Sequence, residues 1–207
     1  METDTISLEI FAQAALPTQF GDFTIVAFSR GEQRIEDVAL VRGQVRGKSN
    51  VPTRLHSECL TGDVFHSLRC DCRQQLEAAQ RHFASLPEAI ILYMRQEGRG
   101  IGLANKIAAY KLQEEGYDTV EANQHLGFDD DLRDYRLAAA MLRALGPESI
   151  DLYTNNPRKI EGLKDSGIIV SGREPIIIQP NVYNDRYLRT KQNRSGHLLN
   201  LEPETGV

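Results

Sequence analysis

Ala89-Ile-Ile-Leu-Tyr-Met94 is the stretch of sequence that decides the fold, because it is apolar throughout and leads into the glycine-rich segment Arg95-Gln-Glu-Gly-Arg-Gly-Ile-Gly102. A strand with one face in water alternates apolar and polar residues, whereas a continuous apolar run is typical of a strand covered on both faces. Pro87 separates this run from the residues before it. We therefore predict a buried strand at 89–94, in the centre of a sheet.

Helices and strands are predicted to alternate around this strand. The expected elements are a helix at 75–83 that ends before Pro87, a helix at 103–115 ended by Gly116 in the left-handed conformation, a helix from about 132 to 145, a strand at 149–153, and a helix capped by Asn155 or Asn156 with Pro157 in its first turn. The first fifty residues favour strands, at 23–28 and 38–45, because these segments are rich in β-branched and aromatic residues. We predict an α/β protein with a layered mixed β-sheet core, flanking helices and an opening β-rich segment.

The composition favours a soluble, cytoplasmic protein with one hydrophobic core. No repeat or proline-rich linker divides the 207 residues, so we expect a single domain over 1–207, ordered at about 15–200 and frayed at 199–207. The 24 Lys and Arg against 29 Asp and Glu give a formal charge of −5, which does not favour nucleic-acid binding. No apolar stretch approaches the roughly 20 residues that span a bilayer, so no membrane partner is expected.

The three cysteines, Cys59, Cys70 and Cys72, are close together in the sequence. An odd, clustered set of cysteines fits metal binding in a reducing compartment better than a disulfide framework. Cys70 and Cys72 flank one residue, so their side chains can point the same way, and the loop from Cys59 must then wrap around a common centre. Three sulfur ligands favour zinc over magnesium or calcium and leave one of its four tetrahedral positions open. The sequence therefore predicts a zinc-binding loop with one zinc ion per chain.

Ligand counting leaves two interpretations of this zinc site open. If the fourth position is free, the metal holds a reactive water, and Glu58 beside the first cysteine is placed to orient or deprotonate it. If His56 or His66 is the fourth ligand, the site is closed and the metal only fixes a loop. The neighbouring Glu58 and the glycine-rich segment favour the catalytic interpretation.

The glycine-rich segment and the end of a later strand are candidates for binding phosphate. Glycines at 98–102 let backbone N–H groups approach an anion at the positive end of a helix dipole, and Arg99 adds a cation there. The segment matches neither the Walker nor the dinucleotide fingerprint, so without Arg99 it indicates only a tight turn. Thr154 and Lys159 bracket a strand end and the next helix, where open α/β sheets bind ligands.

Two further segments have a structural explanation from spacing alone. Tyr110 lies on the same helical face as Leu103 and Ile107, which predicts a core tyrosine. Asp129-Asp-Asp-Leu-Arg-Asp-Tyr135 is expected to begin a helix, where its carboxylates would stabilise the helix dipole.

Five separate segments share one family resemblance. They are Arg54-Leu-His-Ser-Glu-Cys-Leu-Thr-Gly-Asp63, Leu68-Arg-Cys-Asp-Cys72, Arg95-Gln-Glu-Gly-Arg-Gly-Ile-Gly-Leu103, Gly116-Tyr-Asp-Thr-Val-Glu-Ala-Asn123 and Thr154-Asn-Asn-Pro157. Together they resemble the GTP cyclohydrolase II family, and the likeness covers roughly residues 15–200. The resemblance implies a zinc- and magnesium-dependent, usually dimeric hydrolase that opens the imidazole ring of GTP and releases formate and pyrophosphate. Its product, 2,5-diamino-6-ribosylamino-4(3H)-pyrimidinone 5′-phosphate, is the first intermediate of riboflavin synthesis.

The resemblance also implies roles for individual residues. The family's zinc ligands match Cys59, Cys70 and Cys72, which implies an open site whose water attacks C8 of the purine. Its nucleotide contacts match Arg54, Leu55, His56, Ser57, Glu58, Gln75, Glu97, Gly98, Arg99, Thr119, Thr154 and Lys159. Its proton acceptor matches Asp131, its proposed nucleophile at the α-phosphorus matches Arg133, and its ring-opening tyrosine matches Tyr110. GTP is then the substrate, Mg²⁺ accompanies the triphosphate, and a homodimer is expected.

The role of Arg133 remains open between two alternatives. Arginine has a pKa above about 12 and is almost never neutral at pH 7, so Arg133 attacks only if a base such as Asp131 takes its proton. Alternatively, Arg133 only stabilises charge on the phosphate in transit. Arg73 follows the last cysteine where the family favours glycine, which places a bulky cation beside the metal loop.

Other functions are compatible with the same residues. One is a paralogue that releases pyrophosphate but stops at the formylated pyrimidine or supplies another pathway. Another is a zinc-stapled module that binds a nucleotide without converting it. No segment resembles the dihydroxybutanone phosphate synthase half of fused riboflavin enzymes, so a single activity is expected.

Overall fold

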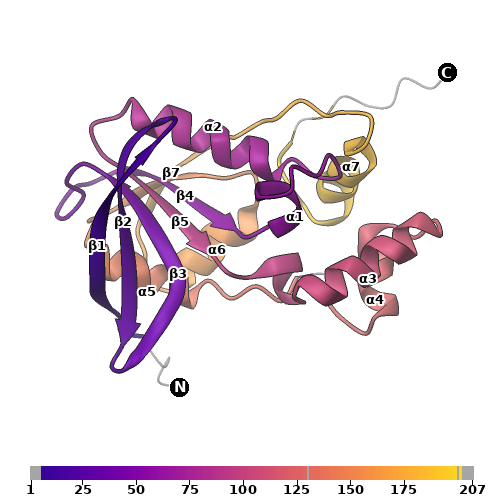
Figure 1. Ribbon diagram of the computed structural model, residues 1–207, viewed down its shortest axis with the longest axis horizontal. Helices are drawn as coiled ribbons and strands as arrows, with labels where there is room; N and C mark the ends of the chain where they lie inside the picture. The colour runs from indigo at the N-terminus through magenta and orange to yellow at the C-terminus, as the bar shows by residue number, and fades with distance from the viewer. Residues whose placement is uncertain (1–5, 130, 200, 202–207) are drawn as a thin grey trace.

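The structure is a computed structural model that describes residues 6–129, 131–199 and 201, and its strands form one mixed sheet (Figure 1). The strands are β1 Glu9–Thr18, β2 Gly21–Arg30, β3 Gln33–Arg42, β4 Val51–Ser57, β5 Ala89–Met94, β6 Ile150–Tyr153 and β7 Val170–Glu174. The helices are α1 Leu60–Asp63, α2 Cys72–Ala84, α3 Leu103–Glu114, α4 Thr119–His125, α5 Arg136–Leu145, α6 Pro157–Asp165 and α7 Asp185–Arg194, with a 3₁₀ turn, η1, at Glu97–Gly100. The strand order is β1-β2-β3-β5-β4-β6-β7.

The strand predicted at 89–94 is β5, the central strand of the sheet. It pairs antiparallel with β3 on one side and parallel with β4 on the other. Ile90 and Leu92 face a core that includes Met141 of α5, whereas Ile91 packs in a second core with Phe83 of α2. Both faces of β5 are therefore covered, which is why its sequence is apolar without alternation.

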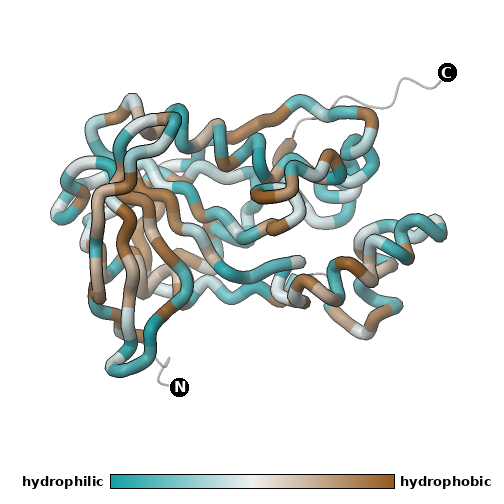
Figure 2. Tube along the Cα trace, in the orientation of Figure 1, coloured by the Kyte–Doolittle hydropathy of each residue, from teal (hydrophilic) through white to brown (hydrophobic). Residues whose placement is uncertain are grey.

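Helices flank both faces of the sheet, so the predicted α/β class and layered core are confirmed. α5 and α6 contribute to the larger core on one face, and α2 covers the other face. Figure 2 shows the hydrophobic segments concentrated in the strands, whereas α7 is largely hydrophilic. β1, β2, β3 and β5 pair antiparallel, and β5, β4, β6 and β7 pair parallel, which makes the sheet mixed.

The predicted helices at 75–83 and 103–115 are present, although α2 begins three residues earlier than predicted and α3 ends one residue earlier. α2 begins at Cys72, α3 ends at Glu114 with Gly116 at a φ of +107°, and Asn156 caps α6 by accepting a hydrogen bond from the Arg158 amide at 3.0 Å. α5 begins at Arg136, so the prediction of a helix from 132 was wrong. The Leu132 amide instead donates to the Arg99 carbonyl at 3.0 Å, which holds 131–135 as a loop against the glycine-rich turn.

Several elements were not predicted, because their burial does not follow the apolar pattern of their sequences. β4 contains Pro52 and charged or polar residues, yet it is almost fully buried between β5 and β6. β1 is mostly exposed at the edge of the sheet, and α7 buries only Leu188 and Lys191. The strand expected at 38–45 ends at Arg42, because Gly43 adopts a φ of +63°.

The prediction of a frayed tail at 199–207 was wrong for Leu199, whose side chain is buried. Leu199 is 5% exposed, whereas residues 200 and 202–207 lie outside the described part of the chain. Within the residues that the structure describes, no helix combines the length and apolar content that crossing a membrane requires.

Candidate active site

Three parallel strands end side by side at one edge of the sheet, and the candidate active site lies there. β4 and β5 are paired through Ser57 and Met94, and β6 runs parallel on the other side of β4. The segments that follow these strands therefore leave the sheet together, at the edge where open α/β sheets bind ligands. A cavity opens at this edge, and its lining comes from β4, the cysteine loop, η1, α3 and the segment after β6.

Most of the residues that the family resemblance indicates line this cavity. These are Arg54, His56, Ser57, Glu58, Cys59, Cys70, Cys72, Gln75, Glu97, Gly98, Arg99, Tyr110, Thr119, Arg133, Thr154 and Lys159. Leu55 does not line it, since successive strand residues face opposite sides and the Leu55 side chain lies in the hydrophobic core. Asp131 is also absent from the lining but forms an ion pair with Arg133.

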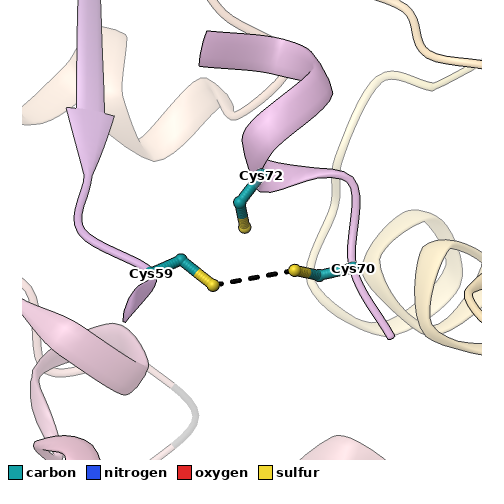
Figure 3. A group of neighbouring side chains, drawn as sticks. All are labelled: Cys59, Cys70 and Cys72. Atoms are coloured by element: carbon teal, nitrogen blue, oxygen red, sulfur yellow. Dashed lines mark hydrogen bonds between the residues drawn. The ribbon is translucent and has the colours of Figure 1, made fainter. Parts of the chain in front are cut away.

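The three cysteine sulfurs point toward one another (Figure 3). Cys59 follows β4, Cys70 lies in the loop before α2, and Cys72 is the first residue of α2. Their sulfur atoms all lie within 4.8 Å of one another, and those of Cys59 and Cys70 are 3.6 Å apart. The loop of 60–69 thus closes on one centre, as the spacing in the sequence predicted.

The donor set fits a zinc ion. Hydrogen bonds from the Cys70 and Cys72 thiols lower the pKa of Cys59 well below its usual range, and the Lys106 ammonium, 3.1 Å from its sulfur, adds to this effect. The same bonds to Cys59 raise the pKa values of Cys70 and Cys72, so Cys59 is the thiolate of the metal-free group. The thiolate is the form that binds metal. Among the described residues no histidine nitrogen joins the sulfur group. The Nε2 atom of His56 is instead 3.0 Å from a carboxylate oxygen of Asp63, which argues against the closed Cys₃His alternative.

Gly62 leaves the space that the three sulfurs occupy. A Cβ atom at this position would lie 2.8 Å from the Cys70 sulfur and 3.1 Å from the Cys59 sulfur. A contact under 3.0 Å forces atoms to move, and here the nearest atom is a sulfur of the three-cysteine cluster. A side chain at position 62 is therefore incompatible with this arrangement of sulfurs.

Replacement of Gly62 by alanine is expected to weaken zinc binding roughly 10- to 100-fold, the range seen when the surroundings of metal ligands are altered. The added methyl group displaces Cys70 or Cys59 from the common centre. Chelator competition measures the change, and Val64→Ala, an exposed position at the end of α1, serves as the control. Equal zinc affinity in both variants would contradict this account of Gly62.

A connected set of polar side chains holds the floor of the cavity beside the metal loop. Arg54 donates to Gln75, Gln75 donates to Asp71, and Lys191 of α7 pairs with Asp71 at 3.1 Å. Burial lowers the pKa of Arg54 to about 10, although the nearby Asp71 carboxylate opposes the shift. Because Asp71 lies between Cys70 and Cys72, this network links the metal loop to Arg54 in the cavity lining and to α7.

Cations from other elements face the same cavity. Lys159 of α6 is buried and donates to the Leu55 carbonyl at 2.7 Å, and burial lowers its pKa. Arg99 lies in η1 at a φ of +60°, next to Gly98 at +62°, and donates to Ser195 at 3.2 Å. A left-handed arginine is uncommon, and such backbone strain concentrates at binding sites. The cavity is therefore lined by basic side chains from several segments.

Asp131 and Arg133 form a forked ion pair at the cavity. Arg133 donates from Nε at 2.7 Å and from Nη2 at 2.6 Å to the two oxygens of Asp131. Burial raises the pKa of Asp131, but the hydrogen bonds and charge of Arg133 outweigh it and hold this pKa below its usual range. Burial likewise lowers the pKa of Arg133, but the bond to Asp131 outweighs it and raises the value. Both groups are therefore held in their charged forms.

Glu58 and Tyr110, the candidates for proton transfer, line the cavity from different segments, and the Glu58 carboxylate lies 3.7 Å from the Arg95 guanidinium. The Glu58 amide donates to the Met94 carbonyl at 2.8 Å, and burial raises the pKa of its carboxyl. The Tyr110 hydroxyl is 3.3 Å from the hydroxyl of Thr61, a residue that lies between Cys59 and Cys70 in sequence. The prediction of a core face through Ile107 was wrong, because Ile107 is 54% exposed and the helix turns Tyr110 toward the cavity.

His197 gives the fold a measurable pH dependence. Burial, and then the positive charges of Lys191 and Arg99, lower the pKa of His197 from its ordinary 6.5 to about 3. As the pH falls from 6.5 toward 3, the unfolded chain takes up a proton at this position and the folded chain does not, so the folded state loses stability. We expect the free energy of unfolding of His197→Asn, measured with urea, to fall less between pH 6.5 and 3 than that of the unsubstituted chain. Parallel stability curves for the two proteins would contradict this assignment.

Several residues of the site were missed by sequence reasoning. Asp63 accepts hydrogen bonds from the Cys59 amide at 3.0 Å and from the Tyr93 hydroxyl at 2.9 Å, and Lys106 reaches the Cys59 sulfur. Gly62 and Asp63 lie within the motif at 54–63, and their position in this motif could have indicated that they belong to the site. Nothing in the sequence pattern indicated Lys191, because α7 lacks an apolar face. Arg73 forms an ion pair with Glu77 at 2.5 Å and does not line the cavity.

The fold and this site define an α/β enzyme with a cysteine metal centre beside a cation-lined cavity. A sequence model of the family described as GTP cyclohydrolase II matches residues 9–175. The chain therefore belongs to the GTP cyclohydrolase II family, whose activity is the first step of riboflavin biosynthesis.

Curated relatives agree with this membership. The chain is 52% identical to a GTP cyclohydrolase-2 from Klebsiella pneumoniae over 198 residues, covering 96% of this chain and 99% of that protein. It is 50% identical to a GTP cyclohydrolase-2 from Picrophilus torridus, covering 93% of this chain and 100% of that protein. It is also 52% identical to a riboflavin biosynthesis protein RibBA from Endomicrobium trichonymphae, covering 89% of this chain but 46% of that longer protein.

Proposed function

We propose that this chain hydrolyses GTP as one GTP cyclohydrolase II domain, opening the imidazole ring and releasing formate and pyrophosphate. The observation that supports this most is the meeting of three cysteine sulfurs and the Asp131–Arg133 pair at one cavity. The cysteine cluster suits hydrolytic attack on the purine, and the Asp131–Arg133 pair suits chemistry at the phosphate. The product would be 2,5-diamino-6-ribosylamino-4(3H)-pyrimidinone 5′-phosphate.

The ring-opening half of the reaction would use residues around the cysteines. Cys59, Cys70 and Cys72 would hold zinc, which when bound supplies Lewis acidity and activates water for hydrolysis. Glu58, which directly precedes Cys59 and lines the cavity, would exchange protons with the purine nitrogen or the attacking water. Burial also raises the pKa of Tyr110, which keeps its hydroxyl protonated as a donor. His56 and Ser57 would position the base from the end of β4.

The phosphate half would rely on charged groups from separate elements. Arg54, Arg99, Lys159 and Arg133 would contact the triphosphate, with Gln75, Thr119 and Thr154 adding hydrogen bonds from the cavity wall. Mg²⁺ would enter with the triphosphate through phosphate oxygens, as this ion commonly does. The cations would hold the α-phosphorus in place while pyrophosphate leaves.

Arg133 would act here by stabilising charge. Its hydrogen-bonded pair with Asp131 lowers the pKa of the carboxylate and raises that of the guanidinium, and both shifts oppose transfer of a proton from Arg133 to Asp131. A nucleophilic arginine needs that proton transfer, whereas charge stabilisation needs Arg133 to remain a cation hydrogen-bonded to Asp131. Asp131 would then hold Arg133 in position.

The test is to incubate the purified chain with GTP, zinc and magnesium and to assay formate and pyrophosphate separately. Release of both products in equal amounts supports the proposal. Pyrophosphate alone indicates a paralogue that stops at the formylated pyrimidine, and neither product indicates a nucleotide-binding module. The three thiols suit a reducing compartment, so we place the reaction in the cytoplasm, in a homodimer like that implied by the family resemblance.

A further inference from the structure

Lys106 occupies a position beside the metal site that the proposed mechanism does not use. It lies in α3, and its Nζ atom is 3.1 Å from the Cys59 sulfur, 3.1 Å from the Thr61 hydroxyl and 2.7 Å from a carboxylate oxygen of Glu97. The side chain is 12% exposed. Lysine ordinarily keeps its ammonium in water, so burial at this point requires the partners it has here.

Glu97 holds this lysine and the metal loop at the same time. One carboxylate oxygen accepts from the Leu60 amide at 2.7 Å, and the other accepts from Lys106 and from the Gly98 amide at 2.9 Å. Both oxygens are therefore engaged by the protein itself. Leu60 directly follows Cys59, so Glu97 fixes the backbone after the first cysteine and the cation beside its sulfur.

The Lys106 ammonium would balance the negative charge of a zinc site with three thiolate ligands. Three thiolates carry one more negative charge than a divalent zinc ion balances, and a nearby ammonium offsets the excess. A charge-assisted N–H···S bond also fixes the direction of the sulfur lone pairs. Groups that hydrogen-bond to metal ligands in this way orient them and tune the metal.

We propose that Lys106, held by Glu97, is a positioning residue for the zinc ligand Cys59. Its ammonium donates a hydrogen bond to the Cys59 thiolate and tightens the binding of zinc by this chain. The inference rests on the proposed function only in that the metal bound by the cysteines is zinc. It adds a residue outside the three ligands to the metal site.

The same lysine connects the metal ligand with the candidate proton donor. Tyr110 lies one helical turn after Lys106, and the ammonium is 5.7 Å from the centre of its ring. The Tyr110 hydroxyl and the Lys106 ammonium both contact the Thr61 hydroxyl. Displacement of Lys106 should therefore disturb both the metal and the position of Tyr110.

The experiment measures zinc affinity by chelator competition in the full chain and in Lys106→Met, which keeps the length of the side chain and removes its charge. We expect zinc affinity to fall roughly 10- to 100-fold, the usual range for partners of metal ligands. Lys106→Arg, which keeps a charged donor, should recover part of the loss. The matched control is Lys111→Met, on the same helix but 70% exposed, which should bind zinc as the unsubstituted chain does.

A second readout separates an effect on the sulfur from a general loss of structure. In the cobalt-substituted protein, the sulfur-to-metal charge-transfer absorption should shift in Lys106→Met, because the Cys59 thiolate loses a hydrogen bond. The same absorption should not shift in Lys111→Met. If Lys106→Met does not fold, Lys106→Gln, with an uncharged donor, is compared in its place and should show a weaker affinity and a shifted band.

Zinc affinity within twofold of the unsubstituted chain together with an unchanged cobalt spectrum would overturn the inference. Failure of the proposed function gives a different result, because the unsubstituted chain would then bind no zinc or release no formate. The two failures are therefore distinguished by the unsubstituted chain alone.

Discussion

Replacement of Cys70 by serine is expected to abolish formate release from GTP, with a loss of roughly a thousandfold or more. Zinc chemistry supplies several kcal/mol of transition-state stabilisation, and each 1.36 kcal/mol corresponds to a tenfold change in rate. Serine keeps the size of the side chain but not the soft thiolate, so the sulfur group that meets within 4.8 Å loses one of its three members. Formate release and zinc content are measured on the same preparation.

Pyrophosphate release by Cys70→Ser serves as the internal control. The bonds broken to give the two products lie at opposite ends of the nucleoside, and Arg133 lies in the loop before α5, far from the cysteines in sequence. We expect the variant to retain measurable pyrophosphate release. A variant that contains no zinc and still releases formate at the original rate would contradict the role of the cysteines, and loss of both products would show that the two cleavages depend on one centre.

Replacement of Arg133 by glutamine is expected to reduce pyrophosphate release roughly 100- to 1,000-fold, as for the removal of a preorganised donor to developing charge. The guanidinium is 9% exposed and held by both oxygens of Asp131, so no water replaces it without rearrangement. Arg133→Lys keeps the charge without the fork and should retain more activity than Arg133→Gln. Product assays with GTP and magnesium give the comparison.

Arg136→Gln is the matched control for this variant. Arg136 pairs with Asp134 two residues earlier, as Arg133 pairs with Asp131, but the Arg136 side chain is 64% exposed. Its replacement should leave both products unchanged. Because removing one partner of a buried pair destabilises a fold, thermal unfolding of both variants is compared. Trapping of a covalent phosphoryl adduct on Arg133 would contradict charge stabilisation and favour the nucleophile.

The sequence predicted the parts of the fold that follow from burial on both faces or from helical spacing. The apolar run of β5 identified the central strand, and the apolar spacing at 75–83 identified α2. β4 could not be recognised in the same way, because Arg54 and His56 replace apolar residues where the strand faces the cavity. The residues that make β4 unusual as a strand are those that make it part of the site.

The candidate site was predictable where its residues are close in sequence and less so where tertiary structure joins them. The spacing of Cys59, Cys70 and Cys72 predicted a common centre, and their sulfurs do converge. Spacing alone misplaced Tyr110, because periodicity identifies a helix face but not whether that face meets a core or a cavity. The contact of Lys191 with Asp71 spans 120 residues, and no local pattern predicts it.

Formate release by the zinc-free chain, measured before and after addition of zinc, tests the central claim most directly. The account predicts that the metal-free protein releases no formate from GTP and that activity returns in proportion to added zinc, saturating at one ion for each set of Cys59, Cys70 and Cys72. Formate release at the full rate by protein shown to contain no metal would contradict it.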